Sequence, residues 1–202
     1  MTAFSRNLDA IAATPKSGNE RFTVGSAELP ATLLQFWRWS CSDLLGNAMR
    51  GVLAEYIVGL ALDCVSGQGR MEWDAADLLT ASGVRVEVKS AAYLQSWRQE
   101  RLSPIRFGIQ PTVGWDAQTN TIAAERKRQA DIYVFSVFKH IDQATADPLK
   151  LEQWDFYVMS TTQLDAAVGD QKTIGLASLL RHKPIQCSFS EIQDAVDTVL
   201  GG

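Results

Sequence analysis

Residues 73–97 read WDAADLLTASGVRVEVKSAAYLQSW, and the rest of the chain is organised around this stretch. It predicts a β-hairpin, with one strand over Trp73–Thr80, a loop at Ala81–Gly83 and a returning strand over Val84–Ala92. A three-residue loop that ends in glycine favours a type I turn followed by a left-handed residue, which glycine adopts without steric cost.

The length of this loop sets which residues of the two strands lie opposite each other. It pairs Leu79 with Arg85 and therefore Asp77 with Glu87. Because side chains alternate along a strand, Glu87 and Lys89 share one face, and Asp77 lies on that face as well. Two carboxylates with Cβ atoms about 5 Å apart repel each other, and a sheet gains nothing from this pairing. A divalent cation between them would remove the conflict, since carboxylate oxygens bind hard cations.

An acidic residue two positions before a lysine is a common pattern, and this chain has three: Glu87-x-Lys89, Glu125-x-Lys127 and Asp170-x-Lys172. Only the first is interleaved with valines, follows a hairpin turn and has a second carboxylate in register. The other two lie in polar stretches without alternation, as is typical of solvated surface charges. We therefore interpret only the hairpin as a candidate metal site.

A further acidic residue lies in a predicted helix just before the hairpin. The spacing of apolar residues predicts this helix over about residues 48–64, and Glu55 shares a stripe with small and apolar side chains. A buried, unpaired carboxylate is costly and needs a cation, a metal or a proton. Alternatively, Glu55 lies at the rim of the stripe and pairs with an arginine such as Arg50. The pattern favours neither interpretation over the other.

Four charged residues carry a resemblance to a known family: Glu55, Asp77, Glu87 and Lys89. Together they resemble the PD-(D/E)XK nuclease superfamily, which has the restriction-endonuclease-like fold. The resemblance covers about residues 47–140, and Ala76 stands where the family usually has a proline before the aspartate. The continuation over residues 89–97 is similar to a bacterial subgroup of uncharacterised members in which the strand runs into a segment bearing a glutamine.

The resemblance implies metal-dependent hydrolysis of phosphodiester bonds in nucleic acid. The implied catalytic residues are Asp77, Glu87, Lys89, Glu55 and Gln95. Asp77 and Glu87, with the Val88 carbonyl, would bind one or two Mg²⁺ ions, for which Mn²⁺ could substitute. Lys89 would help to generate hydroxide and stabilise the transition state. Glu55 would orient water or complete the shell of a second metal.

Two other polar residues near the hairpin need a separate interpretation. Gln95 is a neutral side chain that could contact phosphate or water. Asp74 is the alternative acidic ligand. It lies on the opposite face in this register, and a β-bulge would move it to the face of Glu87 and Lys89.

Basic residues are enriched after the hairpin. Seven of the nineteen Lys and Arg residues fall within 42 positions: Arg98, Arg101, Arg106, Arg126, Lys127, Arg128 and Lys139. The net charge of −4 argues against nucleic-acid binding over the whole surface, but it is compatible with a local basic groove. We predict that all of these except Lys139 contact nucleic acid. Residues 126–128 could instead form the solvated face of a helix.

The whole chain predicts one domain, over residues 1–202, with an α/β sandwich fold of the restriction-endonuclease-like type: a central mixed sheet flanked by helices. Its parts are a helical N-terminal part (1–64), a catalytic core (about 47–160) and a helical C-terminal part (161–202). Residues 131–138, nearly all apolar, predict a central strand covered on both faces. The chain has three cysteines without CxxC spacing and only two histidines, which predicts that it has no zinc site. It shows no signal peptide and no apolar run of about 20 residues, and together with the cysteine pattern this predicts a cytoplasmic protein.

Several local expectations complete the outline. Residues 1–27 are polar and predict a short helix at most, followed by a loop. Residues 111–121 predict a loop and residues 123–130 a helical turn. A helix over 190–200 would begin with a capping box formed by Ser190 and Gln193.

Three functions are compatible with these patterns. The first is an active DNA endonuclease of the restriction, repair or defence kind, either monomeric or homodimeric. The second is a catalytically silent nucleic-acid-binding or assembly module that keeps the fold. The third is a metal hydrolase or ligand-binding protein unrelated to nucleic acid, for which no positive signal exists. The presence of Asp77, Glu87 and Lys89 together favours the first.

Overall fold

A computed structural model describes residues 11, 13–65, 67, 69–70, 76–116 and 119–201. In these residues the chain folds around a mixed five-stranded sheet with the order β11-β9-β8-β4-β3. The strands are β3 (Leu78–Leu79), β4 (Arg85–Ala92), β8 (Ile132–Phe138), β9 (Trp154–Ser160) and β11 (Ile185–Cys187). β4 and β8 are parallel, and the other neighbouring pairs are antiparallel.

Strand β8 is the centre of the sheet. All seven of its residues are buried, which confirms the central strand predicted from the apolar run over 131–138. Its neighbour β4 alternates instead: Val86 and Val88 are buried, whereas Glu87 and Lys89 are partly exposed. This alternation separates a core face of β4 from a face that carries charge.

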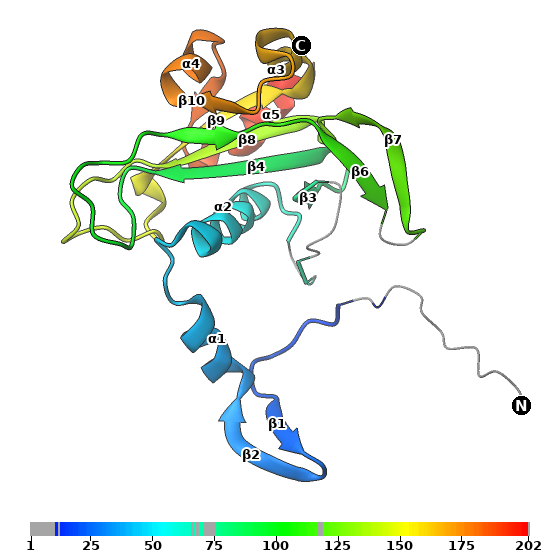
Figure 1. Cartoon of the computed structure of the whole chain (residues 1–202), viewed down its shortest axis with the longest axis vertical. Helices are drawn as coiled ribbons and strands as arrows, with labels where there is room; N and C mark the ends of the chain where they lie inside the picture. The colour runs from blue at the N-terminus through cyan, green and yellow to red at the C-terminus, as the bar shows by residue number, and fades with distance from the viewer. Residues whose placement is uncertain are drawn as a thin grey trace, which may run out of the picture.

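Helices cover both faces of the sheet, so the predicted α/β sandwich is confirmed (Figure 1). One face packs against α2 (Asn47–Ala61) and α5 (Ile192–Gly201). The other packs against α3 (Thr161–Val168), α4 (Leu176–Arg181) and a small two-stranded sheet of β5 (Arg106–Gly108) and β10 (Thr173–Gly175). Two short 3₁₀ helices, Leu151–Gln153 and Phe189–Glu191, complete the body. Among the described residues, none of the helices combines the length and the apolar character needed to span a bilayer.

Two hairpins project from this body (Figure 1). The first joins β1 (Arg21–Val24) to β2 (Ala27–Thr32) and leads into α1 (Leu33–Cys41), a helix without buried residues. The second joins β6 (Thr112–Asp116) to β7 (Thr121–Lys127). Loop or turn is confirmed at residues 13–20, 25–26, 111 and 119–120. The loops predicted over 1–27 and 111–121 were wrong where β1, β2, β6 and β7 lie, and the helical turn predicted over 123–130 was wrong. Exposed strands like these lack the apolar alternation that would reveal them.

The C-terminal part predicted as helical over 161–202 contains α3, α4 and α5, but also the strands β10 and β11, which the prediction missed. The predicted start of the last helix was also wrong. Ser188 and Glu191, rather than Ser190 and Gln193, form the capping box before α5. The chain enters this helix through a 3₁₀ turn, which moves the cap two residues earlier. Gln193 instead bonds to Asp197 one turn further along. Among its described residues, the N-terminal part is likewise helical only in α1 and α2, so the prediction of a helical region over 1–64 was too broad.

Candidate active site

The hairpin of β3 and β4 has the predicted register. Leu79 pairs with Arg85, and Gly83 has a φ of +84°, as the turn requires. Only Leu78–Leu79 of the strand predicted over Trp73–Thr80 is a strand among the described residues; residues 71–75, and with them Asp74, lie outside that part of the chain.

Asp77 comes directly before β3 and faces β4. Its Oδ2 accepts a hydrogen bond of 2.7 Å from the backbone N–H of Val88. The Asp77 side chain thereby occupies a position at the sheet edge that a backbone carbonyl would take if β3 continued. Its carboxylate is held beside the charged face of β4.

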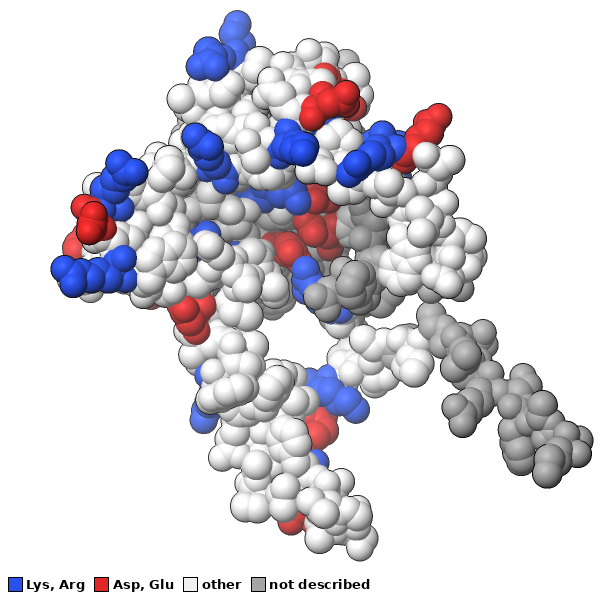
Figure 2. All heavy atoms as spheres, in the orientation of Figure 1, with Lys and Arg blue, Asp and Glu red and all other residues white. Residues whose placement is uncertain are grey.

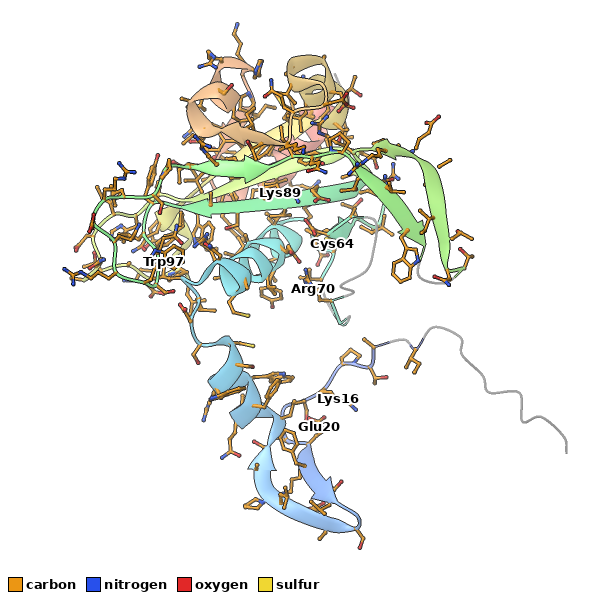
Figure 3. All side chains as sticks on the ribbon, in the orientation of Figure 1. Lys16, Glu20, Cys64, Arg70, Lys89 and Trp97 are labelled. Atoms are coloured by element: carbon orange, nitrogen blue, oxygen red, sulfur yellow. The ribbon has the colours of Figure 1, made fainter. Side chains whose placement is uncertain are left out.

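Lys89 and Glu87 lie on that same face, as predicted, and form an ion pair between Nζ and Oε1. Asp77, Glu87 and Lys89 line one cavity of about 200 Å³, together with Tyr133 of β8. Figure 3 shows Lys89 on β4 above α2, and Figure 2 shows acidic side chains in a hollow of this face with Lys and Arg along its upper rim. The hairpin therefore brings its three charged residues into one concave site.

The charges in this cavity perturb one another. Burial, followed by the neighbouring charge of Glu87, raises the pKa of Asp77 from 3.8 to about 6, although the Val88 N–H opposes the shift. The two carboxylates therefore repel each other, as their cross-strand placement suggested. Burial and Glu87 also raise the pKa of Tyr133, so that its hydroxyl remains a hydrogen-bond donor at neutral pH.

Tyr133 and the cavity residues Gln110, Thr112 and Gln129 were not predicted. Tyr133 reaches the site because it is the register partner of Glu87 in the parallel β4–β8 pair. That register joins segments more than forty residues apart, and no local pattern reveals it. The sequence signal for Tyr133 was limited to a hydroxyl, one of two with that of Ser136, in a strand whose other residues are apolar.

Glu55 lies on the α2 side of Asp77. Its carboxylate accepts two hydrogen bonds from Arg70, at 2.5 and 3.1 Å, so the arginine that satisfies it is Arg70 and not Arg50. Figure 3 shows Arg70 next to the C-terminal end of α2. Glu55 and Asp77 line a shared second cavity, and the charge of Glu55 contributes to the raised pKa of Asp77. The position of Glu55 is close to the site, while its catalytic role stays a prediction.

Gln95 is the one predicted catalytic residue that the structure places elsewhere. Its Oε1 accepts a hydrogen bond of 3.1 Å from Arg50, and its Nε2 donates to the carbonyl of Ala92. It lines other cavities than the one that holds Asp77. The strand β4 ends at Ala92, so the alternation that aligns Glu87 with Lys89 does not extend to Gln95.

Arg128 also differs from its predicted role as a nucleic-acid contact. It is 6% exposed, and its Nε donates to the carbonyl of Ile109 at 2.8 Å. The rest of its guanidinium pairs with Asp165 and donates to the carbonyl of Gly169. It therefore ties the segment after β7 to α3. The other predicted contacts are exposed: Arg98, Arg101, Arg106, Arg126 and Lys127.

We expect Arg128→Met to destabilise the protein by about 2 kcal/mol, because it leaves buried carbonyls without their donor. Arg126→Met, at an exposed position two residues away, should change the stability by less than about 0.5 kcal/mol. Urea denaturation of the two variants measures both effects. Equal stabilities would show that the Arg128 network is not structural.

The donor set of the cavity suits a small hard cation. In the part of the chain that the structure describes, no group of three or more His, Cys, Asp or Glu residues could hold a metal ion. The groups in this cavity that could hold a cation are Asp77, Glu87 and a backbone oxygen. The N–H and C=O of a strand residue point to the same edge, so the Val88 carbonyl faces the edge on which its N–H meets Asp77. Mg²⁺ keeps several waters and needs only one or two carboxylates, which fits this set.

The fold and the cavity together define a mixed α/β protein with a carboxylate–lysine centre on its central sheet. The chain belongs to the bacteriophage T4 endonuclease IV family, a family of nuclease type, whose model matches residues 31–176. The matched span contains Glu55 and all three charged residues of the cavity. No curated protein sequence matches the chain.

Proposed function

We propose that this protein is a metal-dependent endonuclease that hydrolyses phosphodiester bonds in DNA, with a catalytic centre of the PD-(D/E)XK type. The observation that carries the proposal is the convergence of Asp77, Glu87 and Lys89 in one cavity. The name of the matching family, which is that of an endonuclease, supports it independently.

Asp77, Glu87 and the Val88 carbonyl would hold Mg²⁺, which would polarise a phosphate oxygen and lower the pKa of a bound water. Lys89, kept in place by Glu87, can donate to the phosphate and stabilise the charge that develops in the transition state. The Tyr133 hydroxyl remains protonated and can donate to the same group. The Glu55–Arg70 pair supports the site from the α2 side.

The main alternative is a module that binds nucleic acid without cleaving it. Such a module has no use for two partly buried carboxylates that repel each other, because they destabilise the fold and repel phosphate as well. Their retention beside a lysine therefore favours an enzyme.

Incubation of supercoiled plasmid with the full chain tests the proposal. We expect nicked or linear product in Mg²⁺ or Mn²⁺ and none in EDTA. Single-stranded DNA and RNA of the same sequence serve as parallel substrates. Binding of these nucleic acids without cleavage of any of them, in either metal, would favour the silent module.

The exposed cations on β7 give a second prediction. Each Lys or Arg that contacts a backbone phosphate contributes about 0.9 to the slope of log affinity against log salt on duplex DNA. Replacing Arg126 and Lys127 with glutamine should therefore lower this slope by about 2, measured by DNA binding in EDTA. Replacing Arg181 and Lys150, which lie on α4 and in the loop before β9, should leave the slope unchanged. An unaltered slope in the first variant would make these residues ordinary surface charges.

A further inference from the structure

A separate cavity of about 240 Å³ lies where α2 begins, and we call it the α2 cavity. Its polar lining residues are Asn47, Arg50, Ser90, Gln95 and Arg106. No acidic side chain lines it in the part of the chain that the structure describes, in contrast to the catalytic cavity. The α2 cavity therefore combines two arginines with neutral hydrogen-bonding groups.

Arg50 is a buried cation without a carboxylate bonded to it. It is 3% exposed, and among the described residues its guanidinium donates only to neutral acceptors: the Leu45 carbonyl at 2.8 Å, Gln95 Oε1 at 3.1 Å and Asn47 Oδ1 at 2.7 Å. Burial lowers its pKa, and the neighbouring charge of Asp43 opposes this shift. A buried charge whose hydrogen-bond partners are all neutral is costly, and a bound anion would compensate it further than Asp43 does.

Unsatisfied polar atoms gather at the same place. Among the described residues, three buried side-chain nitrogen or oxygen atoms have no hydrogen-bond partner: Arg50 Nε, Ser90 Oγ and Ser136 Oγ. Ser90 and Ser136 are register partners on β4 and β8, and Ser90 lines the α2 cavity with Arg50. A water molecule could satisfy the hydroxyls, but it would add no negative charge to that of Asp43 near the Arg50 guanidinium.

The beginning of α2 contributes less to this preference for an anion. Its N-cap residue, Gly46, supplies no side-chain hydrogen bond, and the first turn contains no acidic residue. Asp43 Oδ1, however, accepts a hydrogen bond of 2.9 Å from the Gly46 N–H, so a carboxylate already lies at the positive end of the helix dipole. The preference for a negatively charged ligand therefore rests on the buried guanidinium of Arg50 and on the exposed Arg106.

The α2 cavity and the catalytic cavity are built on the same two strands. β4 contributes Glu87 and Lys89 to the catalytic cavity and Ser90 to the α2 cavity. β5 contributes Gly108 to the first and Arg106 to the second. Side chains alternate along β4, so Ser90 lies on the α2 face of this strand and Glu87 and Lys89 lie on the opposite face. On β5, by contrast, Arg106 and Gly108 share one face and lie about 7 Å apart, which is about two nucleotide steps of 3.4 Å along a DNA strand.

We propose that the α2 cavity is a phosphate-binding subsite that takes a backbone phosphate of the substrate strand near the phosphate that is cleaved. Arg50 and Arg106 supply the charge, and the Ser90 hydroxyl supplies a donor. Gln95 and Asn47 hold the guanidinium of Arg50 in position. The assignment to a substrate strand rests on the proposed function, whereas the affinity for phosphate does not.

The first experiment measures thermal melting in EDTA, with inorganic phosphate titrated against chloride at constant ionic strength. Ser90→Ala removes a hydroxyl that has no partner in the protein, so it should not lower the stability in chloride. It should weaken phosphate binding about tenfold, as should Arg106→Gln. Arg181→Gln on α4 is the matched control, and any general effect of phosphate on stability is the same in all variants.

Two results of this experiment would overturn the subsite. In one, wild type and Ser90→Ala respond equally to phosphate, which means that the unpaired atoms lie in an ordinary hydrated cavity. In the other, Lys89→Ala abolishes the response while Ser90→Ala keeps it, which means that phosphate binds in the catalytic cavity. Arg50→Met should lose the response most fully. This variant also loses three structural hydrogen bonds, which can prevent it from folding. The test is therefore decided by Ser90→Ala and Lys89→Ala.

The second experiment assigns the phosphate to its source. Oligonucleotides that carry a single neutral methylphosphonate are bound in EDTA. A methylphosphonate at one position near the scissile phosphate should lower the affinity of wild type about tenfold. The affinities of Ser90→Ala and Arg106→Gln, which already lack a contact to this phosphate, should fall only slightly when the same methylphosphonate is introduced. If the affinity falls only when a terminal phosphate of the oligonucleotide is removed, the α2 cavity does not bind a backbone phosphate. If the protein does not cleave plasmid but its melting still responds to phosphate through Ser90, the proposed function is refuted while the phosphate site is supported.

Discussion

Lys89→Ala should reduce the rate of plasmid nicking in Mg²⁺ by about 10²–10³-fold while barely changing the melting temperature. The side chain is partly exposed and, among the described residues, pairs only with Glu87, so its removal costs the fold little. Its contribution falls on the transition state, where a positioned donor to a developing negative charge has effects of about this size. Initial rates of nicked-circle formation, measured alongside melting curves, separate the two effects.

Glu87→Ala extends this test to the metal. It should also abolish cleavage, and it should weaken the stabilisation of the protein by Mg²⁺. Without metal it should raise the stability, because it removes one of two repelling carboxylates. Lys150→Ala, at an exposed position in the loop before β9, is the control for loss of a lysine. Equal nicking by wild type, Lys89→Ala and Glu87→Ala would mean that the activity belongs to another site or to a contaminant.

Asp77→Asn should stabilise the metal-free protein at pH 8 by about 3 kcal/mol, which is the free energy of a pKa shift from 3.8 to about 6. Because the folded-state pKa is raised, the native state holds the proton more tightly than the unfolded state. Wild type therefore loses stability as the pH rises from about 4 to 6, and the loss is complete above about 6. Asparagine cannot ionise and keeps an oxygen that can accept the Val88 N–H.

Urea unfolding in EDTA at pH 4 and pH 8 measures this difference. The gain from Asp77→Asn should be large at pH 8 and nearly absent at pH 4. Asp170→Asn, in the exposed turn after α3, should change the stability little at either pH. A gain of the same size at both pH values would show that the effect is not electrostatic.

Local rules were enough to predict the charged part of the site. The loop ending in Gly83 determined the register of the hairpin, and strand alternation then placed Glu87 and Lys89 on one face with Asp77. The same rules identified β8 as the central strand from its apolar run. These features depend on residues within about fifteen positions of one another.

Features that depend on distant segments were not predictable in the same way. Tyr133 faces Glu87 through a parallel strand pair, and Arg128 is buried against α3, which lies more than thirty residues further along the chain. The choice of Arg70 over Arg50 as the partner of Glu55 likewise depends on how the chain returns after α2. A run of basic residues reads alike in the sequence whether each one is exposed or buried.

Because β3 is short, the position of Asp77 also bears on the solubility of the protein. Among the described residues, β3 pairs with β4 only through Leu78 and Leu79, so β4 continues past the end of its partner. An unpaired strand edge is a template on which a second molecule can add a strand, and proteins commonly block such edges with charged side chains. The Asp77 carboxylate occupies the Val88 N–H at this edge. A carboxylate at this position disfavours the addition of a strand from a second molecule, so the acid proposed to bind the metal would also oppose edge-to-edge aggregation.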